Sequence, residues 1–116
     1  MKPLAGLLAL WLLTGCAGTL AASEADSAAG AAIERGRVLF RDKGCVTCHI
    51  NQRVEGKTGV LNFGAPNLTS YANDPGFLRR WLANPSAVRA GTAMPNLRLT
   101  AVQIEDLIAF LNEPRP

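Results

Sequence analysis

The stretch Cys45-Val46-Thr47-Cys48-His49 decides the fold of this chain. Two thiols separated by two residues lie on one helical turn, where both can add across the vinyl groups of a haem and form thioethers. The histidine that follows then lies under the iron and offers an imidazole nitrogen as axial ligand. His49 is the only histidine, so one copy of the chain cannot supply two histidine ligands. If a second axial ligand exists, methionine is its expected source, and Met94 is the only methionine after Met1.

Other chemistries use the same cysteine spacing. A C-x-x-C pair also occurs in thioredoxin-like redox sites and as half of a zinc site. A zinc site needs about four ligands, and two cysteines with one histidine fall short of that number. The thioredoxin-like reading requires a surrounding βαβ pattern, which the sequence lacks. The pattern therefore favours haem attachment, with a chance pentapeptide in an exported protein as the remaining alternative.

The first fifteen residues have the pattern of a lipoprotein signal peptide. Lys2 gives a short positive region, and residues 4–13 are apolar but too few to span a membrane as a finished helix. The stretch Leu13-Thr14-Gly15-Cys16 resembles a bacterial lipobox, in which the cysteine becomes the lipidated N-terminus. We therefore expect an exported protein that Cys16 anchors to a bacterial membrane, facing the periplasm or the cell exterior. The alternative is an ordinary signal peptide that is cut near residues 21–22.

Residues 16–32 are interpreted as the lipidated N-terminus and a flexible tether. After Cys16 they consist of Ala, Gly, Ser, Thr, Leu and two acids, a composition that cannot bury a core. The helix that follows can begin inside this stretch, because alanine favours helix. Residues 33–116 are left as one small domain. The formal net charge of +3, without a basic run interleaved with aromatic residues, does not indicate a nucleic-acid partner.

Apolar periodicity predicts an all-α domain of three or four short helices, with no sheet beyond one short hairpin at residues 55–59. The first helix is expected over Ile33–Lys43, where apolar residues share a face. Asp74-Pro75 is typical of a helix start, and Asn84-Pro85 is typical of a helix end. Thr100 begins the last helix, with the glutamine of a capping box three residues later.

The motifs between Gly36 and Leu111 together resemble those of class I cytochrome c. In chain order they are G-R-V-L-F before G-C-V-T-C-H, then G-A-P-N-L, N-P-S, G-T-A-M-P and L-T-A-V-Q-I-E-D-L-I-A-F-L. The last third is also similar to short bacterial lipoprotein cytochromes and to cytochrome c domains fused to haem–copper oxidases. The resemblance implies helices around one covalently bound haem c, with loops supplying both iron ligands. It also implies a helix crossing in which Gly36 and Phe40 meet Leu107, Phe110 and Leu111.

The resemblance assigns roles to residues on both sides of the iron. In the family, a proline carbonyl accepts a hydrogen bond from the proximal histidine, and Pro66 occupies that position. Met94 occupies the position of the distal ligand, in a loop where Thr92 and other small residues allow close approach to the haem. Trp81 stands where some family members have a tyrosine that touches the methionine sulfur. Its indole N–H is expected to donate to a haem propionate, to a group beside the ligand or to a carbonyl, with plain core packing as the alternative.

An iron with histidine and methionine ligands has no open position for a substrate, and methionine raises its reduction potential. The resemblance therefore implies a one-electron carrier rather than an enzyme. Expected partners are a quinol–cytochrome c reductase and a terminal oxidase or other reductase. One alternative is the haem subunit of an enzyme complex, in sulfur oxidation for example, that relays electrons from a partner's active site. A catalytic or gas-binding haem protein is a third alternative, which Met94 disfavours.

A positively charged face around the haem edge is a further hypothesis. Its candidate residues are Arg53, Lys57, Arg89 and Arg98. Such a face would steer the domain to an acidic partner, and the association rate would fall as salt rises. A solvated face without a role is the alternative.

Overall fold

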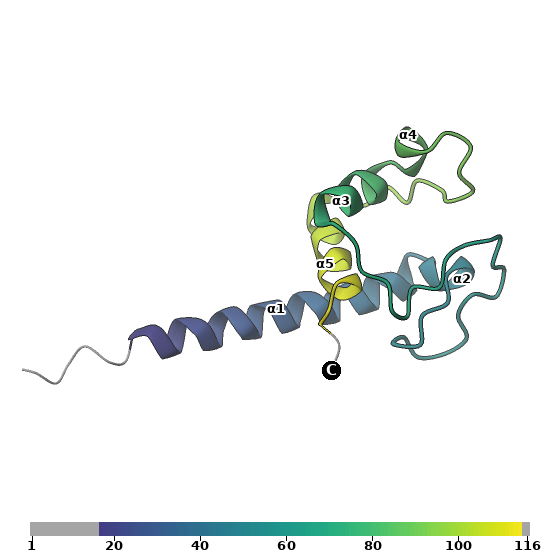
Figure 1. The fold of residues 1–116 in the computed structure, drawn as a ribbon. Helices are drawn as coiled ribbons and strands as arrows, with labels where there is room; N and C mark the ends of the chain where they lie inside the picture. Colours follow the sequence, from purple (N-terminus) through teal and green to yellow (C-terminus); the bar gives the residue numbers. More distant parts are fainter. Residues whose placement is uncertain (1–16, 115–116) are drawn as a thin grey trace, which may run out of the picture.

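The computed structural model describes residues 17–114, with side chains from residue 22 onward. This part of the chain contains five helices and no strand (Figure 1). The helices are α1 (Ala17–Asp42), α2 (Cys45–Cys48), α3 (Pro75–Ala83), α4 (Pro85–Val88) and α5 (Ala101–Leu111). The prediction of an all-α fold is confirmed. Two of the helices are single turns of four residues, and the segment expected as a hairpin has irregular backbone.

The core forms where α1 and α5 cross. Gly36 is the point of closest approach, because a Cβ atom there would overlap the Asp106 carbonyl oxygen and lie 2.7 Å from Phe110 Cβ. Phe40 and Phe110 are almost fully buried and meet edge-on, with ring centroids 5.7 Å apart. Arg35 adds two hydrogen bonds to the Asp106 carboxylate, at 2.8 and 3.0 Å. The crossing predicted from a glycine and an aromatic residue on the first helix is therefore confirmed.

The N-terminal part of α1 projects away from the other helices (Figure 1). Residues 17–32, expected as a flexible tether, are helical and continuous with the packed part of α1. Residues 22–31 are exposed, so tertiary contacts do not account for this helix. Alanine has the highest helix propensity, and extending an existing helix avoids the cost of nucleation. The predicted signal peptide 1–15 and Cys16 lie outside the described residues.

Side-chain caps fix the helices that follow the haem-attachment motif. The Asp74 carboxylate accepts a hydrogen bond from Phe77 N at 2.7 Å, and Pro75 occupies the first turn of α3. Thr100 and Gln103 form the capping box predicted for α5, with reciprocal bonds of 3.2 and 3.1 Å. These caps satisfy amides that have no partner within the helix. Within residues 17–114, we find no helix that is long and apolar enough to cross a membrane.

Candidate cofactor site

The two cysteines of the motif lie on one short helical turn. Gly44 ends the preceding turn in the left-handed conformation, with φ of 77°, and α2 begins directly after it. Cys45 and Cys48 are half-buried free thiols at the two ends of α2. Burial raises the pKa of the Cys45 thiol to about 11, which keeps it neutral at physiological pH. A thioredoxin-like pair depends on a lowered thiol pKa, so this environment speaks against that alternative.

The imidazole of His49 is oriented by a backbone carbonyl. Its Nδ1 lies 2.9 Å from the carbonyl oxygen of Pro66. A carbonyl can only accept, so Nδ1 carries the proton and Nε2 keeps its lone pair for a metal. A bond of this kind fixes the ring and raises the basicity of the ligand nitrogen. The contact predicted for Pro66 is therefore present.

Two segments lie side by side around this contact. Leu68 N donates to the Ile50 carbonyl at 2.8 Å, and Gln52 N donates to Thr69 Oγ1 at 3.1 Å. Asn51 is fully buried, and its side chain is the part of this region that sequence reasoning missed. An isolated asparagine in a polar loop gives no signal of burial. These hydrogen bonds align the two segments so that the Pro66 carbonyl lies beside the imidazole of His49.

The sulfur of Met94 has its own hydrogen-bond donor. The Trp81 indole N–H donates to Met94 Sδ at 2.9 Å. The indole is stacked on Phe77, with centroids 6.0 Å apart and an interplanar angle of 17°. The Arg89 guanidinium lies 5.7 Å from the centroid of the Trp81 ring. The structure thus shows the indole donor on the Met94 sulfur, the atom that the tyrosine of some family members touches, and not on a carbonyl.

Thr92 also contacts Met94, though not in the way that the sequence indicated. Its hydroxyl accepts a hydrogen bond from Met94 N at 3.3 Å and so helps to shape the loop. The expected contact of Thr92 with haem stays a prediction. The same loop turns at Gly91, whose φ of 74° places it in the region that glycine occupies without strain.

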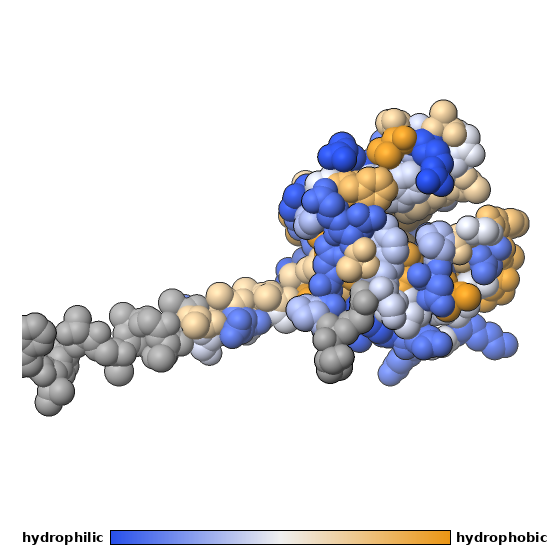
Figure 2. All heavy atoms as spheres, viewed as in Figure 1, coloured by the Kyte–Doolittle hydropathy of each residue, from blue (hydrophilic) through white to orange (hydrophobic). Residues whose placement is uncertain are grey.

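The donor set and the surface fit a covalently bound haem. The chain offers two thiols on one turn, an imidazole with a free Nε2 and a thioether sulfur on a separate loop. In Figure 2 the surface is hollowed between the part that carries α4 and the part that carries α2. Apolar side chains that remain only partly buried against the core include those of Val46, Phe77, Met94 and Leu99. Within residues 17–114, no group of three or more His, Cys, Asp or Glu side chains converges.

The structure corrects the prediction for one of the four basic residues. Arg53 is only 17% exposed, and its guanidinium hydrogen-bonds the Phe110 carbonyl at 2.8 Å. It was assigned to a charged surface because sequence alone cannot show that its loop folds back onto α5. Lys57 and Arg98 are exposed, as the hypothesis requires, and Arg89 is exposed beside Trp81.

A helical fold with this set of donors defines a protein that holds haem covalently. The family model for cytochrome c matches residues 33–113, and the chain belongs to the cytochrome c family. Comparisons with curated proteins and with solved structures gave no match. Members of the family bind covalently attached haem c and transfer electrons with it, so this protein is a haem-dependent electron carrier rather than an enzyme.

Proposed function

We propose that the protein is a membrane-tethered mono-haem cytochrome that carries single electrons between respiratory partners through a His49/Met94-ligated iron. The observation that carries this proposal is the 2.9 Å bond from His49 Nδ1–H to the Pro66 carbonyl. It prepares the only histidine of the chain as a ligand through Nε2. A second support is Met94, whose sulfur is held in place by Trp81 on a separate part of the chain.

Each residue of the site has one task in this mechanism. Cys45 and Cys48 would form the thioethers and His49 and Met94 would hold the iron, and the haem, when bound, would supply one-electron redox chemistry. Pro66 holds the histidine ring in one orientation, which would limit its rearrangement during electron transfer. The partly buried apolar side chains at the edge of the core, Met94 among them, would exclude water from a bound haem and so favour its less charged ferrous state. Two protein ligands leave no position for a substrate.

Covalent attachment is tested by extraction of the denatured protein with acidified organic solvent. We expect the haem to remain with the polypeptide, because two thioether bonds hold it. The variant with Cys45→Ala and Cys48→Ala should lose the haem and much of its folded structure, since the haem supplies part of a small core. Release of haem from the unaltered protein would contradict the proposed role of the two cysteines.

Lipidation at Cys16 is part of the same proposal. It rests on the lipobox-like sequence, and two acyl chains give stable membrane residence where one gives only marginal binding. The exposed helical stretch of α1 would then link the anchor to the haem domain. Mass spectrometry of the native N-terminus tests this: we expect diacylglycerol on Cys16 and none in Cys16→Ala. An unmodified N-terminus near Ser23 would contradict lipidation while leaving electron transfer in place.

The proposed partners are membrane-bound electron donors and acceptors, a quinol–cytochrome c reductase and a terminal oxidase or other reductase. The loop after α2 is hydrogen-bonded to it, by Leu61 N–H to Thr47 O at 2.9 Å, and carries exposed apolar side chains at Val60, Leu61 and Phe63. Lys57 adds an exposed charge to this loop. Electron-transfer rates should fall as salt rises, and Lys57→Glu should weaken that dependence. Co-purification in mild detergent at a fixed 1:1 ratio with an enzyme would instead identify a permanent subunit.

A further inference from the structure

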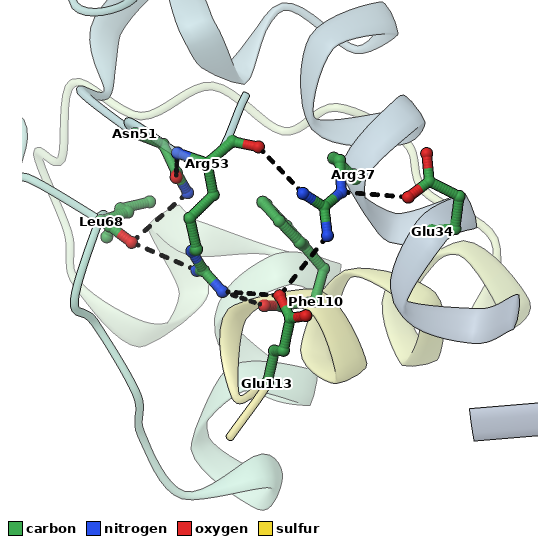
Figure 3. A network of polar contacts seen from close by, with 7 residues as sticks. All are labelled: Glu34, Arg37, Asn51, Arg53, Leu68, Phe110 and Glu113. Carbon is green, nitrogen blue, oxygen red and sulfur yellow. Dashed lines mark hydrogen bonds and ion pairs between the residues drawn. The ribbon is translucent and has the colours of Figure 1, made fainter. Parts of the chain in front are cut away.

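The segment that follows His49 is fastened to the C-terminal end of α5 by one arginine (Figure 3). Arg53 Nη1 donates to the Phe110 carbonyl at 2.8 Å and lies 3.3 Å from a Glu113 carboxylate oxygen. The guanidinium also lies 4.4 Å from the centroid of the Phe110 ring. A largely buried guanidinium with these partners is costly to displace, so it fixes the loop against the core.

The same arginine reaches the segment that carries Pro66 (Figure 3). Arg53 Nη2 donates to the Leu68 carbonyl at 3.4 Å, and Asn51 Nδ2 donates to the same oxygen at 3.3 Å. Asn51 Oδ1 in turn accepts from Arg53 N at 3.0 Å. Arg53 and Asn51 thus hold Leu68, which is two residues from Pro66, by one shared carbonyl.

We propose that Arg53 is a positioning residue for the axial histidine. Acting through Leu68, it keeps the Pro66 carbonyl within hydrogen-bond distance of His49 Nδ1 and thereby lowers the reduction potential of the haem. The carbonyl increases the electron density on the imidazole, which stabilises ferric iron. Loss of Arg53 therefore weakens this bond and raises the potential.

The direction in which the reduction potential changes distinguishes a loss of His49 positioning from a general loosening of the fold. A loosened site admits water to the haem, favours the more charged ferric state and lowers the potential. Loss of the distal ligand also lowers it, because methionine is the ligand that favours ferrous iron. A rise in potential is therefore specific to a weakened His49–Pro66 bond.

Arg37 of α1 offers a matched control. Its guanidinium lies 5.5 Å from the centroid of the same Phe110 ring and 3.6 Å from the same Glu113 carboxylate. Its other contacts go to Glu34 at 3.1 Å and to the Arg53 carbonyl at 3.1 Å, rather than to Leu68 (Figure 3). Replacing Arg37 removes the contacts to the Phe110 ring and to Glu113 that it shares with Arg53, and one bond to the Arg53 carbonyl, while leaving both donors on the Leu68 carbonyl.

The test compares Arg53→Leu with Arg37→Leu in the haem-loaded full chain. Both variants should unfold at lower temperature than the unaltered protein. Only Arg53→Leu should raise the reduction potential. The same variant alone should speed solvent exchange of the His49 Nδ1 proton, measured by NMR, by about tenfold or more, because the bond that protects this proton is weaker. Arg53→Lys keeps the charge but has no planar fork to serve two carbonyls, so it should shift both readouts in the same direction by less.

Two results with Arg53→Leu would overturn the proposal. A lower potential in Arg53→Leu, or equal shifts in both variants, shows a structural role only. If Arg53→Leu does not accumulate with haem, Arg53→Lys decides the matter by itself. An unchanged potential together with unchanged proton exchange in that variant overturns the role assigned to Arg53.

Discussion

The part of the molecule that supplies His49 is tied to the helical core, whereas the loop that supplies Met94 is tied mainly to itself. The residues after His49 are bonded to residues 66–69 and, through Arg53, to the end of α5. In the Met94 loop, Thr92 N donates to the Arg89 carbonyl and Met94 N donates to Thr92 Oγ1, each at 3.3 Å. From outside the loop, Trp81 donates to the Met94 sulfur, and the core packs against part of the Met94 side chain.

This difference indicates how the two ligands respond to stress. The proposed proximal ligand, His49, is positioned by contacts between segments far apart in sequence, so it should be lost only when the core opens. The proposed distal ligand, Met94, depends on hydrogen bonds within its loop, one indole and partial packing against the core, so it should be lost first, by local opening of its loop.

Removing the distal sulfur should have the largest effect. Met94→Ala should lower the reduction potential by roughly 0.1–0.3 V, a fraction of the range of about 0.8 V over which axial ligands set haem potentials. Redox titration measures the shift. Met94→His is the control, since it should also lower the potential while keeping a six-coordinate, low-spin iron. A potential that does not change in Met94→Ala would show that another group is the ligand.

On the His49 side, we expect a loss of unfolding free energy from a substitution at the crossing of α1 and α5. Gly36→Ala places a methyl group against the Asp106 carbonyl and the Phe110 side chain, and should cost about 1–3 kcal/mol of unfolding free energy. Gly30→Ala is the matched control in the same helix, because nothing lies within 4 Å of the added Cβ. That change should be neutral or stabilising by up to about 1 kcal/mol. Denaturant unfolding of both variants checks this, and equal destabilisation would contradict the crossing.

Removing the indole donor should have a smaller effect on the distal side. Trp81→Phe deletes the hydrogen bond to Met94 Sδ, which withdraws electron density from the sulfur and so favours ferrous iron. A bond worth about 1 kcal/mol corresponds to a fall of roughly 40 mV in potential. The variant should also lose methionine ligation at lower denaturant concentration. Phe77→Leu, which removes the stacked ring but keeps the donor, should leave the potential unchanged.

A surface ion pair distant from either ligand should have the smallest effect. Arg79 of α3 bonds Glu105 of α5 at 2.6 and 2.9 Å, and this hydrogen bond lowers the pKa of the exposed Glu105 carboxylate. A lowered carboxylate pKa gives stability that is present above its unfolded value and is lost as pH falls through the folded pKa. Arg79→Gln should therefore lower the melting temperature slightly at neutral pH and not in strong acid. An equal loss of melting temperature at both pH values would exclude a role for the charge of Glu105.

Local patterns predicted the caps and the helix crossing correctly. Asp74, Thr100 and Gln103 act within a few residues of their own position, so their chemistry can be read without tertiary structure. A close approach of another backbone at Gly36 was predicted because this glycine lies on an apolar helix face, and the crossing of α1 and α5 confirms that approach. These features require only helix periodicity and the known preferences of capping residues.

The burial of Arg53 and Asn51 could not be predicted in the same way. Both lie in a polar loop, and they donate to the carbonyls of Leu68 and Phe110, which any residue type would supply. The side chains that Arg53 also contacts, Phe110 and Glu113, lie far away in sequence. Contacts to backbone atoms leave no mark on the partner's sequence. The sequence allows the first helix to begin inside residues 17–32 but does not predict that the whole stretch is helical: a composition that cannot form a core can still extend a helix that has already begun.

The most direct test of the account is exposure of the unaltered ferrous protein to carbon monoxide at neutral pH. With His49 and Met94 both bound to iron, we expect no rapid change in the visible spectrum, whereas Met94→Ala should bind the gas readily. Rapid binding by the unaltered protein would show an open iron. It would contradict the closed His49/Met94 site and favour a gas-binding or catalytic haem protein over an electron carrier.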